Sequence, residues 1–436
     1  MCEITKENDS LQRQTENKDE DSQKIQGNKN IPELRFPEFE GEWITYKLCD
    51  VVTRIIRKNK NLETKRPLTI SAKYGLIDQI EFFDKYVASK NLKGYYLLKK
   101  GEFAYNKSYS NGFPYGAVKR LDLYNQGAIS TLYICFEITN KINSNFLKIY
   151  FDSNKWNKEM YKIAVEGARN HGLLNIPIND FFNTKHIFPS ISEQEKIADF
   201  LSAIDKKIGF MEKKHTLYQS IKKYFLENLF PHDSKIPYLR LPMFSDEFKR
   251  FTLNELFISK KGKGLSKDKI QEDGENKCIL YGELYTTYSQ IISTIKSRTN
   301  IFEGVLSNKM DILMPCSTTT TGKDLATASV LLKENVLLGG DITILRKKKD
   351  ILDEIYFAYY LSFCLNKTLT SLAQGSTIIH LYWNHIKNIE VLIPSKEEQI
   401  QIAKIIKLLD DKIEQSSLQI NNLKDYKKGL LQKMFV

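Results

Sequence analysis

Residues 189–208 read PSISEQEKIADFLSAIDKKI, and residues 394–413 read PSKEEQIQIAKIIKLLDDKI. Nine of the twenty positions are identical, and the two stretches lie 205 residues apart. Each begins with Pro-Ser and continues with apolar residues at spacings of three and four, which is typical of an amphipathic helix. The same helix start written twice in one chain indicates an internal duplication, and this duplication decides the predicted architecture.

The duplication extends well beyond these two stretches. Residues 31–43, IPELRFPEFEGEW, return as IPYLRLPMFSDEF at residues 236–248, again 205 positions later. We call these two stretches the opening segments. Toward the other end of each copy, Lys222 is matched by Lys427. The chain is therefore predicted to contain two copies of one unit, each with a mixed part of about 160 residues followed by a long helix.

Short β-rich runs alternate with turn residues in the mixed part of each copy. The runs are RPLTISA at 66–72, GAISTLYICFEI at 127–138, HIFPS at 186–190, CILYGEL at 278–284, GGDITILR at 339–346 and EVLIPS at 390–395. One helical segment precedes a glycine in each copy, ending at Gly167 in the first and at Gly375 in the second. Each mixed part is thus predicted to be a compact α/β domain.

Bulky or apolar residues recur in steps of four and three along both long helices, which indicates a coiled-coil seam. In the first helix the stripe is broken only at Lys222, and in the second Ser416 and Lys427 are polar positions in register. The residues expected to pair the helices are Ile197, Leu201, Ile204, Ile208, Ile402, Ile406, Leu409 and Ile413. Chain connectivity then requires an antiparallel pair, with the two mixed domains at opposite ends.

These patterns predict an α+β fold with a pseudo-two-fold internal repeat, in which two similar mixed α/β domains are separated by two long antiparallel coiled-coil helices. The predicted boundaries are a disordered leader at 1–30, a first mixed domain at 31–190, a spacer helix at 191–232, a second mixed domain at 233–395 and a second spacer helix at 396–436. The leader is assigned because it has almost no periodic apolar residues.

The charge of the chain favours a polyanionic partner. The net charge is +12 at pH 7, and residues 1–30 hold seven acidic and five basic side chains, so the remaining residues carry about +14. Such an excess favours nucleic acid, although a lysine-rich composition produces it without any function. No run of eighteen apolar residues predicts a membrane span. The six cysteines are scattered without a Cys-x-x-Cys pair, which favours reduced thiols in a cytoplasm.

Motifs for catalysis are missing from the sequence. A base-flipping amino-methyltransferase needs an Asn/Asp-Pro-Pro-aromatic loop, and the chain has no Pro-Pro. STTTTGKD at 317–324 lacks the leading glycine of a phosphate loop and has an acid where Ser or Thr should follow the lysine. Glu247 and Lys249 mimic a nuclease pair that the first copy lacks, and His380 and His385 have no third ligand. We therefore expect neither an enzyme nor a metal site.

Two groups of residues are candidates for contact with DNA. Basic residues after each opening segment suit phosphate contact, and they are Arg54, Arg57, Lys58, Lys60, Lys260, Lys261, Lys263 and Lys267. Base reading needs polar side chains at a rigid edge, and the candidates are Lys107, Ser108, Ser110, Asn111, Arg169, Asn170, His171, Ser317, Thr318, Thr319, Lys323, Ser376 and Thr377. The alternative interpretation is that these are solvated loops and ordinary polar turns.

Together these motifs resemble those of the specificity subunits of type I restriction-modification systems. The matching features are the two Leu-Arg-(Phe/Leu)-Pro openings, the two Pro-Ser-x-x-Glu-Gln-x-x-Ile-Ala helix starts and the ending KKGLLQKMF at 427–435. The resemblance covers residues 31–436. It implies that each mixed domain is a target-recognition domain that reads one half of a bipartite double-stranded DNA sequence.

The resemblance also implies partners. The helices are expected to dock two methyltransferase subunits, and restriction/translocase subunits join in the full complex. No cofactor is expected on this chain, because S-adenosylmethionine, ATP and Mg are implied for the partner subunits. Two other functions fit the sequence, namely a coiled-coil adaptor that binds only protein and a stand-alone DNA-binding regulator. The target bases have no signature in the sequence, because loop side chains define them.

Overall fold

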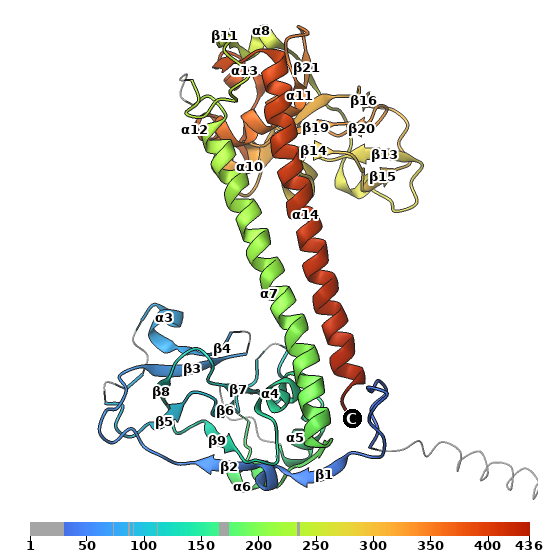
Figure 1. Cartoon of the computed structure of the whole chain (residues 1–436). Helices are drawn as coiled ribbons and strands as arrows, with labels where there is room; N and C mark the ends of the chain where they lie inside the picture. The colour runs from blue at the N-terminus through green and yellow to red at the C-terminus, as the bar shows by residue number, and fades with distance from the viewer. Residues whose placement is uncertain are drawn as a thin grey trace, which may run out of the picture. The chain divides into compact units, whose positions relative to one another are not determined.

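The computed structural model describes residues 30–72, 74–85, 88–89, 91–110, 112–164, 174–232 and 236–436. Of the predicted leader at 1–30, all but Asn30 lies outside the described residues. The chain divides into two compact units (Figure 1). Unit 1 comprises Met1–Phe210 with Gln419–Val436, and unit 2 comprises Met211–Leu418. Each mixed domain therefore lies in one unit together with part of each long helix.

Unit 1 is built on two four-stranded sheets, with strand orders β2-β9-β6-β7 and β4-β3-β8-β5. The first contains β2 (Val52–Ile55), β6 (Phe103–Asn106), β7 (Ala117–Arg120) and β9 (Ile134–Ile138). The second contains β3 (Pro67–Ser71), β4 (Gly75–Asp78), β5 (Tyr96–Lys99) and β8 (Gln126–Ile129). All neighbours are antiparallel except the β3–β8 pair. The helices are α2 (Leu48–Val51), α3 (Gln79–Phe83), α4 (Ser144–Asp152), α5 (Asn157–Ile163) and α6 (Ile178–Asn183).

Unit 2 repeats this topology and adds one strand, β14, parallel to the edge strand β19, so that its sheets have the orders β12-β21-β17-β19-β14 and β15-β13-β20-β16. Its strands are β12 (Phe257–Lys261), β13 (Asn276–Ile279), β14 (Ile291–Ile292), β15 (Ser297–Thr299), β16 (Val305–Leu306), β17 (Asp311–Pro315), β19 (Ser329–Leu331), β20 (Leu337–Leu338) and β21 (Ile342–Lys347). The parallel strand pair β13–β20 of unit 2 corresponds to the parallel pair β3–β8 of unit 1. The duplication seen in the sequence is therefore a duplication of the fold.

The opening segments lead into matching two-stranded sheets. In unit 1, β1 (Ile44–Lys47) pairs antiparallel with β10 (Lys185–Phe188). In unit 2, β11 (Lys249–Thr252) pairs in the same way with β23 (Glu390–Ile393). Because each second strand directly precedes a long helix, these sheets bring the opening segments next to the helix starts.

The other α-helices and β-strands of unit 2 are short. They are α8 (Leu253–Leu256), α9 (Glu283–Thr286), β18 (Ser317–Thr318), α10 (Gly322–Leu325), α11 (Glu354–Tyr359), α12 (Asn366–Ser371), β22 (Ile379–His380) and α13 (Trp383–Ile386).

Where one helical segment was expected in each copy, unit 1 has α4 and α5, separated at Asn154, whose φ of 63° is left-handed and ends a helix. In unit 2 a π-helical turn at Tyr360–Cys364 separates α11 from α12.

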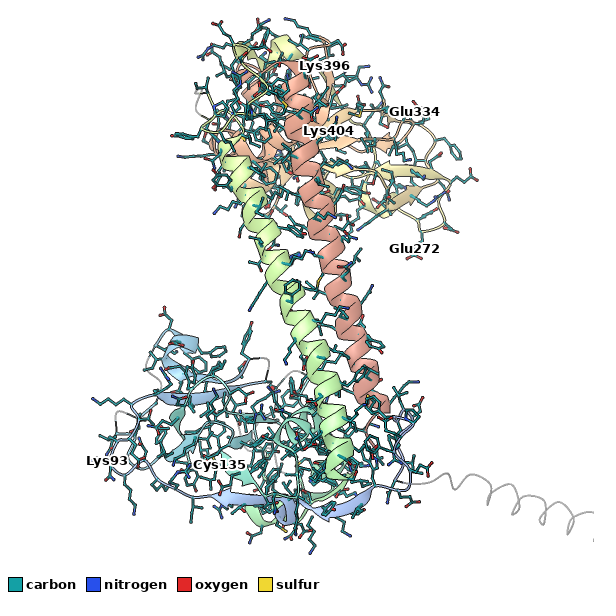
Figure 2. All side chains as sticks on the ribbon, in the orientation of Figure 1. Lys93, Cys135, Glu272, Glu334, Lys396 and Lys404 are labelled. Atoms are coloured by element: carbon teal, nitrogen blue, oxygen red, sulfur yellow. The ribbon has the colours of Figure 1, made fainter. Side chains whose placement is uncertain are left out.

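The core of each unit includes parts of both long helices. In unit 1, Phe146, Phe188 and Leu201 pack in one cluster with Met434 and Phe435. The corresponding cluster of unit 2 joins Leu226, Phe230, Ile402 and Ile406 to its sheets and short helices. Burying one such side chain contributes roughly 1.5–3 kcal/mol, so the helix ends are anchored by many apolar contacts. A second core of unit 1 contains Cys135 on β9 (Figure 2).

The helices α7 (Ile191–Asn228) and α14 (Lys396–Lys433) are 38 residues long each. In unit 2, His215 Nδ1 lies 2.8 Å from Ser416 Oγ, and Lys222 Nζ lies 2.5 Å from Asp410 Oδ1. Residue numbers rise along one helix as they fall along the other, so the pair is antiparallel there. Of the eight residues expected to pair the helices, Ile197, Leu201, Ile208, Ile402 and Ile406 are buried, and Ile204, Leu409 and Ile413 are half-buried.

The lysine that interrupts the apolar stripe has a structural explanation. Lys222 forms an ion pair with Asp410 in unit 2, and Lys427 forms one with Asp205 at 2.6 Å in unit 1. Both members of one pair lie 205 positions from both members of the other. The interruption is thus one interhelical ion pair that the duplication copied, and a charge in a seam helps to specify its register.

One ion pair, present in both units, joins the opening segment to the start of the long helix. Arg35 donates from Nε and Nη2 to the buried carboxylate of Glu193, with both distances 2.8 Å. In unit 2, Arg240 donates to Glu398 at 3.1 Å and 2.8 Å. The arginines come from the opening segments and the glutamates from the helix starts, so we call these pairs the clamps. The repeated sequence motifs therefore have a structural role, because the opening segment and the helix start of each copy supply the two partners of one ion pair.

Candidate DNA interface

A buried asparagine shapes the basic loop of unit 1, which connects β2 to β3. Asn59 is fully buried, and its Nδ2 donates to Thr64 O at 2.9 Å. In return, Thr64 N donates to Asn59 Oδ1 at 3.2 Å. These bonds hold residues 59–64 in a defined turn, so neighbouring lysines project from an ordered base. The sequence analysis missed Asn59, because one asparagine in a polar loop has no pattern that predicts burial.

The four basic candidates of this loop divide into two kinds. Arg57 forms an ion pair with Glu102 at 2.7 Å, and Lys58 Nζ donates to a backbone carbonyl at 2.9 Å. The side chains of Arg57 and Lys58 are thus engaged in contacts within the domain. Arg54 on β2 and Lys60 in the loop are exposed. Exposed, flexible cations suit phosphate contact, so Arg54 and Lys60 are the stronger candidates.

The base-reading candidates of unit 1 follow β6. Lys107 Nζ donates to Ile176 O at 3.3 Å, and Ser108 and Ser110 are half-buried in the turn beyond it. The other predicted residues here, Asn111, Arg169, Asn170 and His171, lie outside the described residues.

The basic candidates of unit 2 are more exposed. Lys260, Lys261, Lys263 and Lys267 extend from β12 into the next loop, and all four are exposed. Lys261 Nζ lies 3.2 Å from Asp341 Oδ1, and this hydrogen bond raises the pKa of Lys261 above its ordinary value. This part of unit 2 therefore has a surface of cations suited to a polyanion.

The hydroxyl candidates after β17 are placed differently from expectation. Ser317 is 3 % exposed and donates from Oγ to Asp341 Oδ2 at 2.9 Å. Thr318 is 1 % exposed, and its Oγ1 lies 2.7 Å from Thr320 Oγ1. Because both hydroxyls are buried and bonded within the domain, we leave Ser317 and Thr318 out of the base-reading set. Thr319 is exposed and stays in it.

The stretch that mimics a phosphate loop is a helix cap. Asp324 accepts from Thr320 Oγ1, from Thr321 N at 3.1 Å and from Thr321 Oγ1 at 2.8 Å. This is a capping box for the short helix α10, so the acid after Lys323 has a local structural role. Lys323 itself is exposed and remains a candidate for DNA contact.

The second polar turn of unit 2 lies against the first. Gln374 and His380 exchange backbone hydrogen bonds of 2.9 Å and 2.7 Å, which closes a turn with Ser376 and Thr377 exposed. β18 and β22 pair through Ser317 and His380. The turn needs its glycine, because Gly375 has a φ of 117° and a Cβ there would lie 2.1 Å from Ile378 O.

One polar cluster joins these segments. His380 Nδ1 lies 2.9 Å from Tyr382 Oη, and Lys261 Nζ lies 5.4 Å from the centre of the Tyr382 ring. Lys261 and Ser317 both bond Asp341. Candidates from β12 and β18, which are far apart in the sequence, thus meet at one aspartate that the sequence analysis did not single out, and Tyr382 links His380 to the same lysine.

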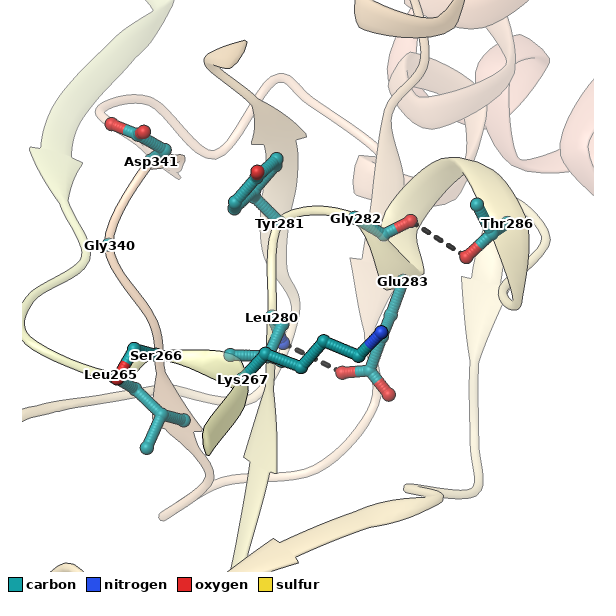
Figure 3. A pocket seen from close by; sticks show the side chains of 10 residues that line it. All are labelled: Leu265, Ser266, Lys267, Leu280, Tyr281, Gly282, Glu283, Thr286, Gly340 and Asp341. Atoms are coloured by element: carbon teal, nitrogen blue, oxygen red, sulfur yellow. Dashed lines mark hydrogen bonds between the residues drawn. The ribbon is translucent and has the colours of Figure 1, made fainter. Parts of the chain in front are cut away.

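A hollow of about 560 Å³ adjoins this cluster. Its lining includes Lys267, Tyr281, Glu283, Gly340 and Asp341 (Figure 3). Glu283 accepts from Leu280 N at 2.7 Å and from Ser297 Oγ at 2.5 Å, so its carboxylate is engaged within the wall. Asp341 is the more open of the two carboxylates.

Features of other functional classes are few. Within the described ranges, no group of three His, Cys, Asp or Glu side chains could hold a metal ion, and no helix is long and apolar enough to cross a membrane. His380 and His385 both bond Tyr382. Burial raises the pKa of the Cys135 thiol to about 12, which makes it a poor nucleophile.

Comparisons with known proteins agree with this architecture. A family model described as the type I restriction modification DNA specificity domain matches residues 245–424. The putative type I restriction enzyme MjaX specificity subunit of Methanocaldococcus jannaschii is 24 % identical over 302 residues, which are 67 % of this chain and 67 % of that relative. The type I restriction enzyme MjaVIII specificity subunit of the same organism is 22 % identical over 320 residues, covering 70 % and 73 %.

The fold is similar to that of a solved structure. The crystal structure of the type I restriction-modification system S subunit from M. genitalium matches with a TM-score of 0.57 at 18 % identity, covering 93 % of this chain and 99 % of that one. The duplicated domains, the clamps and these similarities lead to one conclusion. The chain is similar in sequence and in fold to specificity subunits of type I restriction-modification systems.

Proposed function

We propose that the chain recognises DNA for a type I restriction-modification complex, with each mixed domain reading one half of a bipartite duplex target. The observation that carries the proposal is the duplicated two-sheet domain with exposed cations in the corresponding region of both copies, on or just after β2 and β12. Exposed Arg54 and Lys60 supply them in unit 1, and Lys260, Lys263 and Lys267 in unit 2. Two similar surfaces on one chain suit two separate half-sites.

The paired helices α7 and α14 are proposed to dock two methyltransferase subunits. Large apolar side chains remain exposed on them, including Phe210, Leu217, Tyr224, Leu408 and Leu418, each more than half exposed. Exposed large apolar side chains on these helices are consistent with a protein partner. Restriction/translocase subunits are proposed to join this assembly, with S-adenosylmethionine, ATP and Mg bound by the partner subunits. The helices are also proposed to set the gap between the half-sites.

The chain itself is proposed to be non-catalytic. The side chains that mimic catalytic motifs have structural roles, since Asp324 caps α10 and His380 bonds Tyr382. We therefore expect no turnover of S-adenosylmethionine by the purified chain alone. Turnover by the isolated chain, retained through further purification, contradicts this part of the proposal.

The proposal is tested by co-expressing the chain with the methyltransferase subunit of its own system and mapping methylated adenines across the host genome. We expect one bipartite motif with a fixed gap. A culture without this chain, expressing the methyltransferase subunit alone, is the control and should lack that motif. A continuous motif, or unchanged methylation in the control, refutes two-domain recognition.

Binding of the purified chain to random duplex DNA separates this function from that of a protein-only adaptor. We expect affinity to fall steeply with salt, because released counterions drive phosphate binding. Lys60→Ala should lower the slope of log K against log salt by about one. Lys412→Ala, which removes an exposed lysine from α14, is the matched control and should leave the slope unchanged. Salt-insensitive or absent binding favours the adaptor, and specific binding without any methyltransferase partner favours a stand-alone regulator.

A further inference from the structure

We propose that Asp341 reads the exocyclic amino group of a cytosine in the half-site of unit 2, an inference that rests on the proposed function and adds a specificity-determining residue to it. Asp341 lies in the turn between β20 and β21, at the meeting point of the polar cluster and the hollow (Figure 3). Three observations support this role: the position of Asp341 in the turn, the exposure of its carboxylate and the lysines around it.

The backbone holds Asp341 in a demanding conformation. Its φ is 58°, in the left-handed region that residues other than glycine seldom adopt. Cys316 N donates to Asp341 O at 2.7 Å, which ties the turn to the end of β17. The side chain therefore projects from a position defined by two neighbouring strands, as a base-reading group requires.

The carboxylate is oriented but not saturated. Ser317 Oγ donates to Oδ2 at 2.9 Å, and Lys261 Nζ lies 3.2 Å from Oδ1. A carboxylate has about four acceptor positions, so about two remain open. The side chain of Asp341 is 38 % exposed, which leaves it accessible. Ser317, buried and unable to reach a base itself, thus positions the group that can.

Electrostatics select the kind of group that Asp341 can meet on DNA. The aspartate lies beside Lys261 and lines the same hollow as Lys267, where the cations suit phosphate. A carboxylate repels phosphates. The neighbouring lysines can bind the phosphates, so the favourable partner for Asp341 on DNA is a hydrogen-bond donor on a base edge. In the major groove the donors are the amino groups of cytosine and adenine, and acidic side chains pair with cytosine N4. Adenine presents an acceptor beside its amino group, which would face the second carboxylate oxygen.

The equivalent position in unit 1 supports a reading role. In each unit the parallel strand pair leads into the turn, with Ile129 opposite Leu68 and Leu338 opposite Ile279. Leu132 and Asp341 both lie three residues beyond, so they occupy the same place in the two copies. Leu132 is 67 % exposed. The strand pairing is kept while the exposed side chain changes from apolar to acidic, as expected where two domains read different bases.

The test uses the chain with its methyltransferase partner. Asp341→Asn removes the charge and keeps the size, and asparagine tolerates the left-handed backbone, so the fold should be retained. We expect methylation of adenines in the wild-type motif to fall about ten-fold or more, with the preference for cytosine lost at one position of one half-site and the other half-site unchanged. Asp350→Asn is the matched control, because Asp350 is an exposed acid of the same unit that pairs with Lys396. It should leave the motif unchanged.

A second measurement needs no variant. Wild-type complex is assayed on duplexes in which each cytosine of the half-site is replaced, one at a time, by an analogue that lacks the amino group. One replacement should weaken binding about ten-fold, and Asp341→Asn should be insensitive to it. Equal binding to all analogues, a half-site without cytosine, or an unchanged motif for a folded Asp341→Asn overturns the inference. If the wild-type complex methylates no bipartite motif, the proposed function itself fails.

Discussion

The two clamps correspond in sequence, but their glutamates have different numbers of hydrogen-bond donors. Replacing the arginine should therefore lower the stability of the two units by unequal amounts. In unit 1, Glu193 accepts from Arg35 and also from Trp43 Nε1, which lies 3.2 Å away. Position 248, which answers Trp43, is a phenylalanine and cannot donate. Among the described residues, the side-chain hydrogen bonds of Glu398 come from Arg240 alone. We therefore predict that Arg240→Met destabilises unit 2 more than Arg35→Met destabilises unit 1.

The magnitude follows from burial. The Glu398 side chain is 1 % exposed and that of Arg240 is 27 % exposed. Removing one partner of a buried ion pair costs about 3–5 kcal/mol, and the partial exposure of Arg240 places the expected cost near the lower end, at about 3 kcal/mol. In Arg35→Met the indole bond to the charged Glu193 survives, and such a bond contributes about 1.5–3 kcal/mol. The expected cost there is roughly 1–2 kcal/mol.

Hydrogen exchange along a urea series measures both costs locally. Peptides that cover β11 and β23 report on unit 2, and peptides that cover β1 and β10 report on unit 1. The double variant Arg240→Met with Glu398→Leu removes both charges and should recover at least half of the loss, because no unpaired charge remains. Equal losses for the two arginine variants, or a double variant no better than Arg240→Met, would refute the assignment of unequal support.

Three further predictions concern acid stability and recognition. Buried His186 bonds Tyr150 and Thr184, and burial lowers its pKa to about 4; because the unfolded chain binds that proton near pH 6.5, unit 1 should lose up to about 3 kcal/mol as the pH falls from 6.5 to 4. Unit 2 has Val391 at this place and should not show this loss, which local hydrogen exchange checks; equal losses in both units would count against it. Replacing residues 53–166 by the corresponding part of a relative should change one half of the methylated motif, and a change in both halves contradicts separate reading. Inserting four residues into both α7 and α14 adds about 6 Å and turns each helix by about 40°, so the mapped gap should lengthen by one or two base pairs; unchanged spacing excludes the helices as the ruler.

The duplication, the antiparallel helix pair and the alternation of strands with turns could be predicted from the sequence. These features depend on local patterns, because a helix or strand buries one face and its apolar residues repeat with that period. The offset of 205 residues between matching segments predicted that the chain contains two units of the same fold, since similar sequences fold alike. Residues 1–29 of the predicted leader and the candidates at 169–171 lie outside the described residues.

The candidate site depended on tertiary structure. Sequence patterns placed Ser317 on an exposed polar turn, but the fold buries it against Asp341, 24 positions away. The sequence patterns identified Lys222 only as an interruption of the apolar stripe, whereas in the structure it forms an ion pair with Asp410. Polar contacts of this kind join segments that the sheets and helices bring together, and no spacing along the chain specifies them. Periodicity therefore determined which faces are buried, whereas only the packed structure decided which polar groups are engaged inside and which, such as Asp341, remain open to a partner.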